Sequence, residues 1–216
     1  MRRFDLVLFD WDGTISVTDE LIVRSVWDLS DLYGLADRPS REKIVSVSHL
    51  PLKELLYSCI DPGDVLPSQV CEAYVRYACK NLVDGLAPLC DGAREAFAAL
   101  RRAGIRTGVF SNKDRKQLGF FSEYTGIAGL SDVVISTDDV KTPKPAPEGL
   151  LLAMKKTGVR YADRVLYVGD NTIDYDLAAN SGARSAIVLY ARRELETYVK
   201  PDYLISSLAE LTDICI

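Results

Sequence analysis

The feature that most limits the fold of this 216-residue chain is a series of short, continuous apolar runs that alternate with helical patterns. Such runs are typical of strands buried on both faces of a parallel sheet, because half-exposed strands alternate polar and apolar residues. The runs lie at residues 4–9, 105–110, 132–136, 164–169, 185–190 and 202–205. Their alternation with helices predicts an α/β fold, a doubly wound parallel sheet with helices on both faces.

Several segments between these runs carry helical signals. Residues 91–104 repeat apolar side chains at helical spacing, with Asp91 as the expected N-cap and Gly104 as the stop. Residues 146–158 open on Pro147 in the first helical turn and close on Gly158. Residues 192–196 mix opposite charges and are expected to form an exposed helix.

The alternation breaks between Ser16 and Leu86, where only helical patterns occur. One expected helix face there carries five apolar residues, namely Leu21, Ile22, Val26, Leu29 and Leu32. We therefore predict a core made of residues 1–15 and 87–216, with residues 16–86 as a helical insertion.

The charge balance limits the partners of the chain. It has 26 basic and 31 acidic residues and a net charge of −5, so it lacks the basic excess that binds nucleic acid or an anionic membrane. No apolar stretch reaches the roughly 18 residues that suggest a membrane span. We expect no nucleic acid and no membrane as partners; the sequence leaves monomer and homodimer open.

The five cysteines, an odd number without a C-x-x-C pair, read as reduced and mostly buried thiols. The apolar stretch near the N-terminus is too short for a signal peptide. These features together predict a cytoplasmic protein.

Polar residues follow the carboxyl ends of the expected strands, which is where open α/β sheets bind ligands. They are Asp10, Asp12, Ser111, Asn112, Asp170 and Asp174, with Lys144 in the loop after the strand at 132–136. Several acids, a hydroxyl group and a lysine at one edge of a sheet predict a site for a divalent cation and a phosphate group.

The residue types indicate the chemistry. Asp10 and Asp12 are two apart and can share one site, and a hard cation such as Mg²⁺ takes one or two carboxylates, for which Asp10 and Asp170 are the obvious pair. One carboxylate can attack phosphorus while its neighbour exchanges protons. Lys144 supplies positive charge, and Ser111 and Thr14 supply hydroxyl donors.

Structural alternatives exist for some of these residues. Asp174 could be the N-cap of the helix that follows it. Ser111 and Asn112 could cap the helix after their strand, although capping and phosphate binding use the same helix N-terminus.

Four segments in order resemble the motifs of the haloacid dehalogenase-like hydrolases, in their phosphoglycolate-phosphatase-like branch. They are FDWDGT at 9–14, VFSNK at 109–113, KTPKPAPE at 141–148 and YVGDNTIDYDLAANSGA at 167–183. The resemblance covers the whole expected core and implies a Rossmann-like sheet. It also implies that residues 16–86 are a helical cap over the active site.

By this resemblance Asp10 is the nucleophile and Asp12 the general acid and base. Thr14, Ser111 and Asn112 bind the phosphoryl group, and Lys144 stabilises its charge. The Mg²⁺ ligands are Asp10, Asp12 through its carbonyl group, and Asp170, with Asp174 as an outer ligand or as the partner of Lys144.

Other polar and aromatic residues receive a structural interpretation. The candidates for substrate contact in the insertion are expected to be core or surface residues; they are His49, Arg24, Arg76, Lys80, Tyr74 and Tyr77. Lys113 and Lys141 are expected to be solvated, and Trp11 is expected to pack against the core beside the site.

The leading functional hypothesis is a Mg²⁺-dependent phosphatase that hydrolyses a small phosphate monoester, a phosphorylated metabolite, through an aspartyl-phosphate. The nearest alternative is a sugar phosphomutase of the beta-phosphoglucomutase type. An alternative from another class is a phospho-accepting, receiver-type signalling domain.

Overall fold

A six-stranded parallel sheet forms the centre of the computed structural model, which describes residues 3–190 and 195–216. Its strands are β1 (Leu6–Phe9), β2 (Arg106–Phe110), β3 (Val133–Ile135), β4 (Val165–Gly169), β5 (Arg184–Val188) and β6 (Tyr203–Ile205). Their order across the sheet is β3-β2-β1-β4-β5-β6, and every neighbouring pair is parallel. The predicted fold class is confirmed, and each of the six apolar runs coincides with a strand, although β5 begins one residue before its run.

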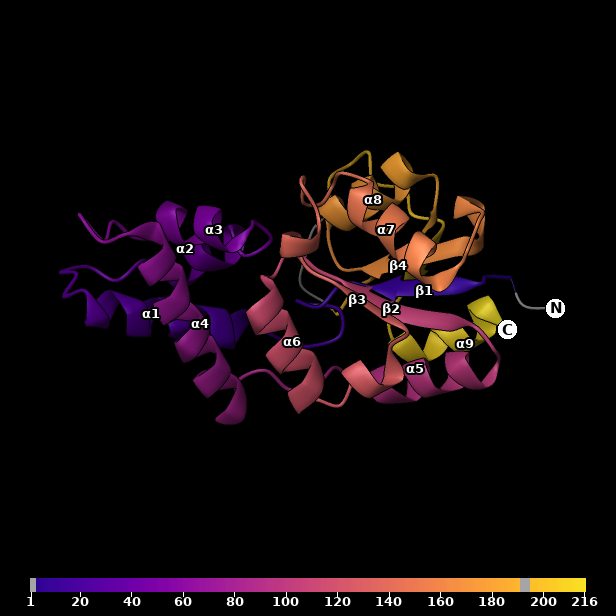
Figure 1. Ribbon diagram of the computed structural model, residues 1–216, viewed down its shortest axis with the longest axis horizontal. Helices are drawn as coiled ribbons and strands as arrows, with labels where there is room; N and C mark the ends of the chain where they lie inside the picture. The colour runs from indigo at the N-terminus through magenta and orange to yellow at the C-terminus, as the bar shows by residue number, and fades with distance from the viewer. Residues whose placement is uncertain (1–2, 191–194) are drawn as a thin grey trace.

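Side chains alternate between the two faces of the sheet, and each face has its own helical layer. In β1, Leu6 and Leu8 pack in one apolar cluster, and Val7 and Phe9 pack in the other. Helices α7 (Glu148–Thr157) and α8 (Thr172–Ser181) cover the first face. The second face is covered by α5 (Ala93–Arg102), α6 (Arg115–Tyr124) and α9 (Leu211–Cys215) (Figure 1). The buried strands explain why their sequences are apolar throughout.

The predicted helix ends are partly correct. Gly92, not Asp91, is the N-cap residue of α5, with a φ of 78° that favours glycine. Pro147 directly precedes α7, and Gly158 ends it in the left-handed conformation. The helix expected at 192–196 falls mainly on residues outside the described part of the chain.

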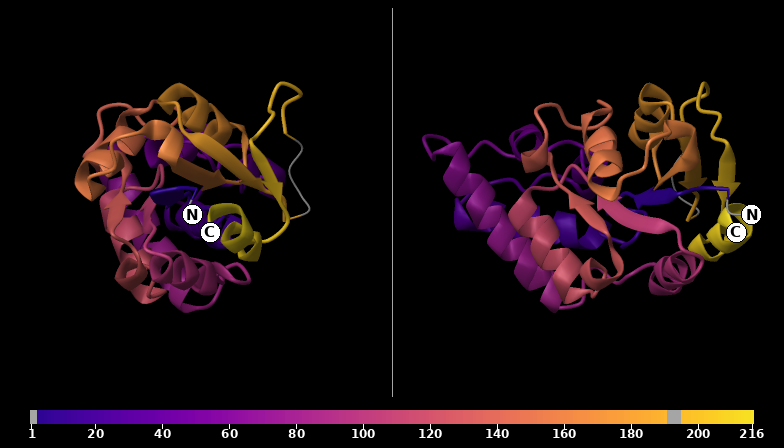
Figure 2. Two further views of the ribbon diagram at one scale, coloured as in Figure 1. Left: turned by 90° about the vertical axis from the view of Figure 1, so that its right-hand side faces the viewer. Right: turned by 45° about the vertical axis from the view of Figure 1, so that its right-hand side comes forward.

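Four helices between β1 and α5 lie to one side of the sheet (Figures 1 and 2). They are α1 (Asp19–Leu32), α2 (Arg41–Ser46), α3 (Leu52–Cys59) and α4 (Pro67–Val83). Helix α1 packs along α4, and α4 also packs along α6 of the sheet layer. Leu32 is 49% exposed, contrary to expectation, because it is the last residue of α1. The predicted division at 15/16 and 86/87 stays a prediction.

The two segments that connect the sheet with these helices run side by side. Ser16 forms an antiparallel bridge with Leu89, and the Val17 N–H donates to the carbonyl oxygen of Pro88 at 3.0 Å. The Ser16 hydroxyl group lies 3.1 Å from the carbonyl oxygens of both Ala87 and Pro88. The chain therefore enters and leaves the helical region at one place.

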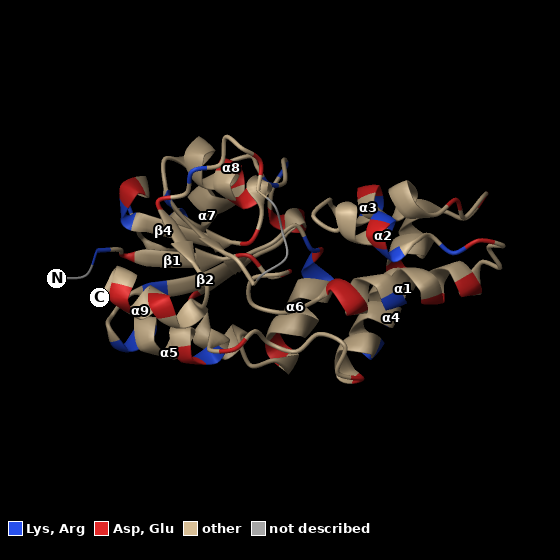
Figure 3. Cartoon of the chain, turned by 180° about the vertical axis from the view of Figure 1, so that it is seen from behind, with Lys and Arg blue, Asp and Glu red and all other residues tan. Residues whose placement is uncertain are grey.

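The surface and the thiols of the described residues show no unusual feature. Basic and acidic segments are interspersed over both halves of the chain (Figure 3). None of the helices in residues 3–190 and 195–216 has the length and apolar character that crossing a membrane requires. All five cysteines are free, as expected, but only Cys90 and Cys215 are buried and the other three are half-buried, so the expectation of mostly buried thiols was wrong. Burial raises the pKa of Cys90 to about 11 and that of Cys215 to about 12.

Candidate active site

The carboxyl ends of three neighbouring strands place polar side chains at one edge of the sheet. Asp10, Ser111 and Asp170 directly follow β1, β2 and β4. The backbone pairing continues one residue beyond the strands, because the Asp10 N–H donates to the carbonyl oxygen of Val168 at 2.8 Å. The Ser111 N–H likewise donates to the carbonyl oxygen of Ile135 at 3.1 Å, so the sheet itself holds Asp10 and Ser111.

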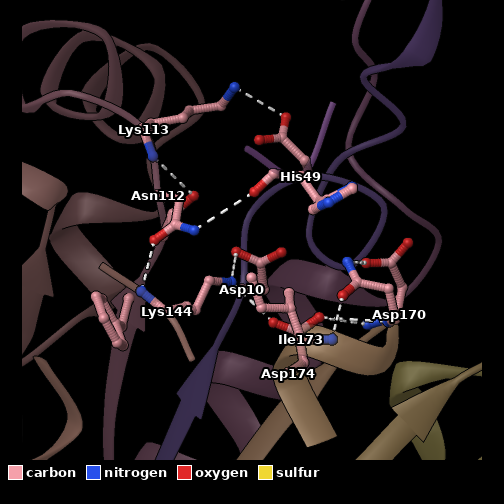
Figure 4. A network of polar contacts seen from close by, with 12 residues as sticks. Asp10, His49, Asn112, Lys113, Lys144, Asp170, Ile173 and Asp174 are labelled. Carbon is pink, nitrogen blue, oxygen red and sulfur yellow. Dashed lines mark hydrogen bonds and ion pairs between the residues drawn. The ribbon is translucent and has the colours of Figure 1, made fainter. Parts of the chain in front are cut away.

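Lys144 lies at the centre of a buried polar cluster (Figure 4). Its Nζ atom is 2.7 Å from Asp10 Oδ1 and 2.8 Å from Asp174 Oδ1. It also donates to the Tyr167 hydroxyl group at 3.2 Å, and that hydroxyl group donates to the carbonyl oxygen of Phe110 at 2.7 Å. The side chain of Lys144 is only 3% exposed, so its charge is compensated by these neighbours and not by water.

Asn112 holds the Lys144 loop in position. The Lys144 backbone N–H donates to Asn112 Oδ1 at 3.0 Å, and Asn112 Nδ2 donates to the carbonyl oxygen of His49 at 3.4 Å (Figure 4). The amide group of Asn112 thus bridges the end of β2, the lysine loop and the helical region. Neither Asn112 nor Ser111 caps the next helix: the N-cap of α6 is Asp114, which accepts from the Gln117 N–H at 2.9 Å.

Asp174 connects the lysine to the end of β4. Its Oδ1 atom pairs with Lys144, and its Oδ2 atom accepts from the backbone N–H groups of Asp170 at 3.1 Å and Asn171 at 3.3 Å. Asn171 is the N-cap of α8, and Asp174 occupies position N3 of the same helix, where the two residues form a capping box. The alternative that Asp174 is the N-cap is therefore wrong. A side chain at Gly169 would overlap Asp174, so this close approach requires glycine.

Three buried carboxylates form a group that could hold a metal ion. Oxygen atoms of Asp10, Asp170 and Asp174 lie within 4.8 Å of one another. Lys144 compensates one of the three negative charges, so a divalent cation would bring the group to neutrality. An all-oxygen donor set fits a hard cation such as Mg²⁺. Gly13, with a φ of 74°, lets the loop after β1 pass over the Asp170 carboxylate, which a side chain there would overlap.

Burial and neighbouring charges set the protonation of this group. Burial raises the pKa of Asp10 to about 6; Lys144 opposes this change, and the Asp174 and Asp12 carboxylates add to it. Burial lowers the pKa of Lys144, but Asp10 and Asp174 outweigh this effect and hold the pKa well above its ordinary value. Lys144 therefore stays protonated, whereas Asp10 titrates closer to neutrality than an exposed aspartate.

A second ion pair lies on the other side of Asp10. Lys113 Nζ is 2.9 Å from Asp12 Oδ1 and 5.2 Å from the centre of the Phe121 ring. The Lys113 side chain is 7% exposed, so the expectation that it is solvated was wrong, because the carboxylate and the aromatic face hold it inside. Lys141 is exposed, as expected. Trp11 is fully buried with its ring centre 6.1 Å from that of Phe121, which confirms its predicted packing.

Two hydroxyl groups were predicted to bind a phosphoryl group. Ser111 is 2% exposed, and its Oγ atom accepts from the Lys113 N–H at 3.4 Å. Thr14 is fully buried, and its hydroxyl group has no hydrogen-bond partner among the described residues. The two residues lie in the loops that follow β1 and β2.

A cavity of about 40 Å³ lies between these strand ends and the helical region. The core lines it with Asp10, Asp12, Ser111 and both lysines among others. The helical region contributes mainly apolar side chains and some polar ones; they include Ile22, His49, Leu52, Leu55 and Tyr74. Tyr74 is a buried core residue, as expected, but it also faces the cavity. The sequence analysis does not identify Gln117 as a cavity residue. The one signal for it is its position, about one helical turn after the VFSNK segment at 109–113.

Known proteins match this chain in sequence and in fold. The family model described as haloacid dehalogenase-like hydrolase matches residues 7–188. The chain is 30% identical over 218 residues to the pyrophosphatase PpaX of Bacillus velezensis. This alignment covers 99% of this chain and 97% of the relative.

Solved structures share the fold. CbbY from Rhodobacter sphaeroides, in complex with phosphate, has a TM-score of 0.85 at 24% identity and covers 96% of each chain. A predicted phosphoglycolate phosphatase from Haemophilus somnus has a TM-score of 0.86 at 21% identity and covers 99% of each chain. The sequence match spans most of the core, and the folds agree over nearly the whole length. The predicted family is therefore confirmed: this chain belongs to the haloacid dehalogenase-like hydrolases.

Proposed function

We propose that this enzyme is a Mg²⁺-dependent phosphatase that hydrolyses a small phosphate monoester through an aspartyl-phosphate on Asp10. The observation that carries the proposal is the buried contact of Asp10 with Lys144, beside two further carboxylates and a cavity. Such a group combines a nucleophile, a fixed positive charge and a set of cation ligands. In this proposal residues 16–86 act as the cap over the site.

The first step transfers the phosphoryl group to the enzyme. A carboxylate oxygen of Asp10 attacks phosphorus, the bond from phosphorus to the leaving oxygen breaks, and Asp12 gives its proton to that oxygen. Lys144, Ser111 and Thr14 bind the phosphoryl oxygens, and Asn112 supports them by holding the Lys144 backbone in place.

The second step returns Asp10 to its free form. A water molecule attacks phosphorus of the aspartyl-phosphate, and Asp12 takes a proton from it. The bond between Asp10 and phosphorus breaks, and inorganic phosphate is released. Asp12 can perform both proton transfers because it gives up its proton in the first step and is therefore a carboxylate when water attacks.

Asp10, Asp170 and the carbonyl group of Asp12 would hold the cation, with Asp174 as an outer ligand that also pairs with Lys144. The cation, when bound, stabilises negative charge on the phosphoryl oxygens. The charge balance supports this assignment, since Lys144 alone leaves two of the three buried carboxylates uncompensated.

The substrate class is proposed from the relatives and the site together. A small cavity between the two regions, lined by Asp10, Ser111 and Lys144, supports a small phosphorylated metabolite. The similarity to a protein named pyrophosphatase makes pyrophosphate one candidate. We expect the enzyme to act in the cytoplasm, where its five thiols would remain reduced.

A screen for phosphate release with Mg²⁺ tests the proposal, with Asp10→Asn as the control variant. We expect the variant to lose at least ~10² in rate, as for a missing catalytic group. Activity near that of the wild type would refute the role of Asp10. Isomerisation of a hexose phosphate would identify a phosphomutase, and stoichiometric labelling without turnover would identify a phospho-accepting domain.

A further inference from the structure

Gln117 is a buried polar residue that the proposed reaction does not use. It lies in α6, is 2% exposed and lines the cavity. Its Nε2 atom is buried and has no hydrogen-bond partner among the described residues. Because an unpaired buried amide donor is costly, its position points to a ligand that completes it.

Tyr74 lines the same cavity from the helical region. It lies in α4 and is 2% exposed. Burial raises the pKa of its hydroxyl group, the Asp12 and Asp114 carboxylates add to this change, and the amide group of Gln117, which can act as a hydrogen-bond donor, opposes it. The Tyr74 hydroxyl group and the Gln117 amide group therefore lie close to each other in the lining of one cavity. The hydroxyl group stays neutral and can donate a hydrogen bond.

Both residues lie on the Asp12 side of the site. Lys113 pairs with Asp12 and packs on Phe121, which is one helical turn after Gln117 in α6. In the proposed reaction Asp12 protonates the leaving oxygen. Gln117 and Tyr74 line the same cavity as Asp12, so in the proposed reaction they would lie beside the leaving group, and Lys144 with its carboxylates beside the phosphoryl group and the cation.

The rest of the cavity limits what can lie there. Ile22, Leu52 and Leu55 form apolar walls, and both lysines that line the cavity, Lys113 and Lys144, are in ion pairs with aspartates. Two neutral donors between apolar walls suit a small group that offers an oxygen acceptor. They do not suit a plain alkyl group, which would leave the buried Gln117 donor unpaired.

We propose that Gln117 and Tyr74 together bind an oxygen atom of the leaving group and thereby select small oxygen-bearing phosphate compounds over alkyl phosphates. This inference rests on the proposed phosphatase function. Since Gln117 belongs to the sheet layer and Tyr74 to the helical region, a substrate oxygen bound by both also joins the two regions across the site.

Four substrates test the proposal as a matched set. Phosphoglycolate offers a carboxylate oxygen, hydroxyethyl phosphate a hydroxyl oxygen and pyrophosphate a phosphoryl oxygen. Ethyl phosphate is similar in size but offers no further oxygen. The kcat and KM of Gln117→Met and Tyr74→Phe are measured on all four. Gln69→Met, at an exposed position of α4, is the matched control.

We expect each variant to lose about tenfold in kcat/KM on at least one oxygen-bearing substrate, the effect of one hydrogen bond. The loss should lie mainly in KM, and ethyl phosphate should change less than twofold. The substrate that loses most identifies the oxygen as carboxylate, hydroxyl or phosphoryl. Gln69→Met should act as the wild type does on every compound.

Two results would overturn the inference. One is an equal loss on all four substrates, which would indicate a structural role; the other is no loss on any. If Gln117→Met does not fold, Tyr74→Phe, which removes one hydroxyl group, decides alone. The proposed function fails separately: it requires the wild type to release phosphate from these compounds, whatever the two variants do.

Discussion

The strand ends of the core and the helical region opposite them differ in where their buried polar groups lie relative to the cavity. In the core, Lys144, Asp10 and Asp174 come from segments far apart in the sequence and bind one another. In the helical region, Asn81 donates to Ser25 Oγ at 3.1 Å and to Asp28 Oδ2 at 3.0 Å, away from the cavity. The core therefore turns its charges toward the cavity, and the helical region turns mainly apolar walls toward it.

In the proposed function, this difference would separate the residues that perform the reaction from those that select the substrate. The charges of the core compensate one another, so changing one of them affects stability and reaction together. An apolar wall acts through contact area, so a change there alters the fit of one substrate relative to another. Each of the following predictions tests that separation.

The largest effect is expected for Lys144→Met. It leaves the two buried carboxylates of Asp10 and Asp174 without their lysine partner, so the free energy of unfolding should fall by about 3–5 kcal/mol. Phosphate release should fall by about 10²–10³, because the positive charge of Lys144 no longer stabilises the negative charge on the phosphoryl oxygens. Urea unfolding and a phosphate assay measure both, with exposed Lys141→Met as the control. An unchanged unfolding midpoint would contradict the interpretation of the core cluster.

An effect of about tenfold is expected for Mg²⁺ affinity between pH 8 and pH 5. The pKa of Asp10 in the metal-free protein is about 6, so at pH 5 the cation must displace a proton. Since this pKa lies above the ordinary 3.8, metal-free stability should fall as the pH rises from about 4 to about 6, and Mg²⁺ should restore it. Calorimetric titration at both pH values measures the affinity. Asp10→Asn should bind Mg²⁺ more weakly with little dependence on pH; a dependence equal to that of the wild type would exclude Asp10 as its source.

The smallest effect is expected for Leu52→Val in the wall of the helical region. The change removes one methylene group, worth ~0.8 kcal/mol or about fourfold in kcat/KM for a substrate that contacts it. The kcat for the smallest ester should stay the same. Kinetics on a panel of esters measure this, with the exposed Leu66→Val as the control. A large loss of kcat on every ester would show that the helical region takes part in the chemistry.

The sequence predicts the core better than the region that faces it, for a physical reason. Asp10, Ser111 and Asp170 follow apolar strands directly, so the fold class alone places them at one edge. The pair of Lys113 and Asp12 depends on how two side chains turn after their strands, and the role of Gln117 depends on the packing of α6 against α4. Such contacts arise between elements and leave no pattern along the chain. The start of α5 is another example: the sequence predicts Asp91 as its N-cap, whereas the structure has Gly92 there.

The paired connecting segments at Ser16 and Pro88 have an evolutionary consequence. Because the chain leaves the sheet and returns at one place, tied by the Ser16 hydroxyl group, the intervening residues form a cassette. Such a cassette can be lengthened, shortened or exchanged without altering the order or the register of the strands. A lineage with this architecture can therefore acquire a new substrate by recombination at two neighbouring points, while the reaction it inherits stays unchanged.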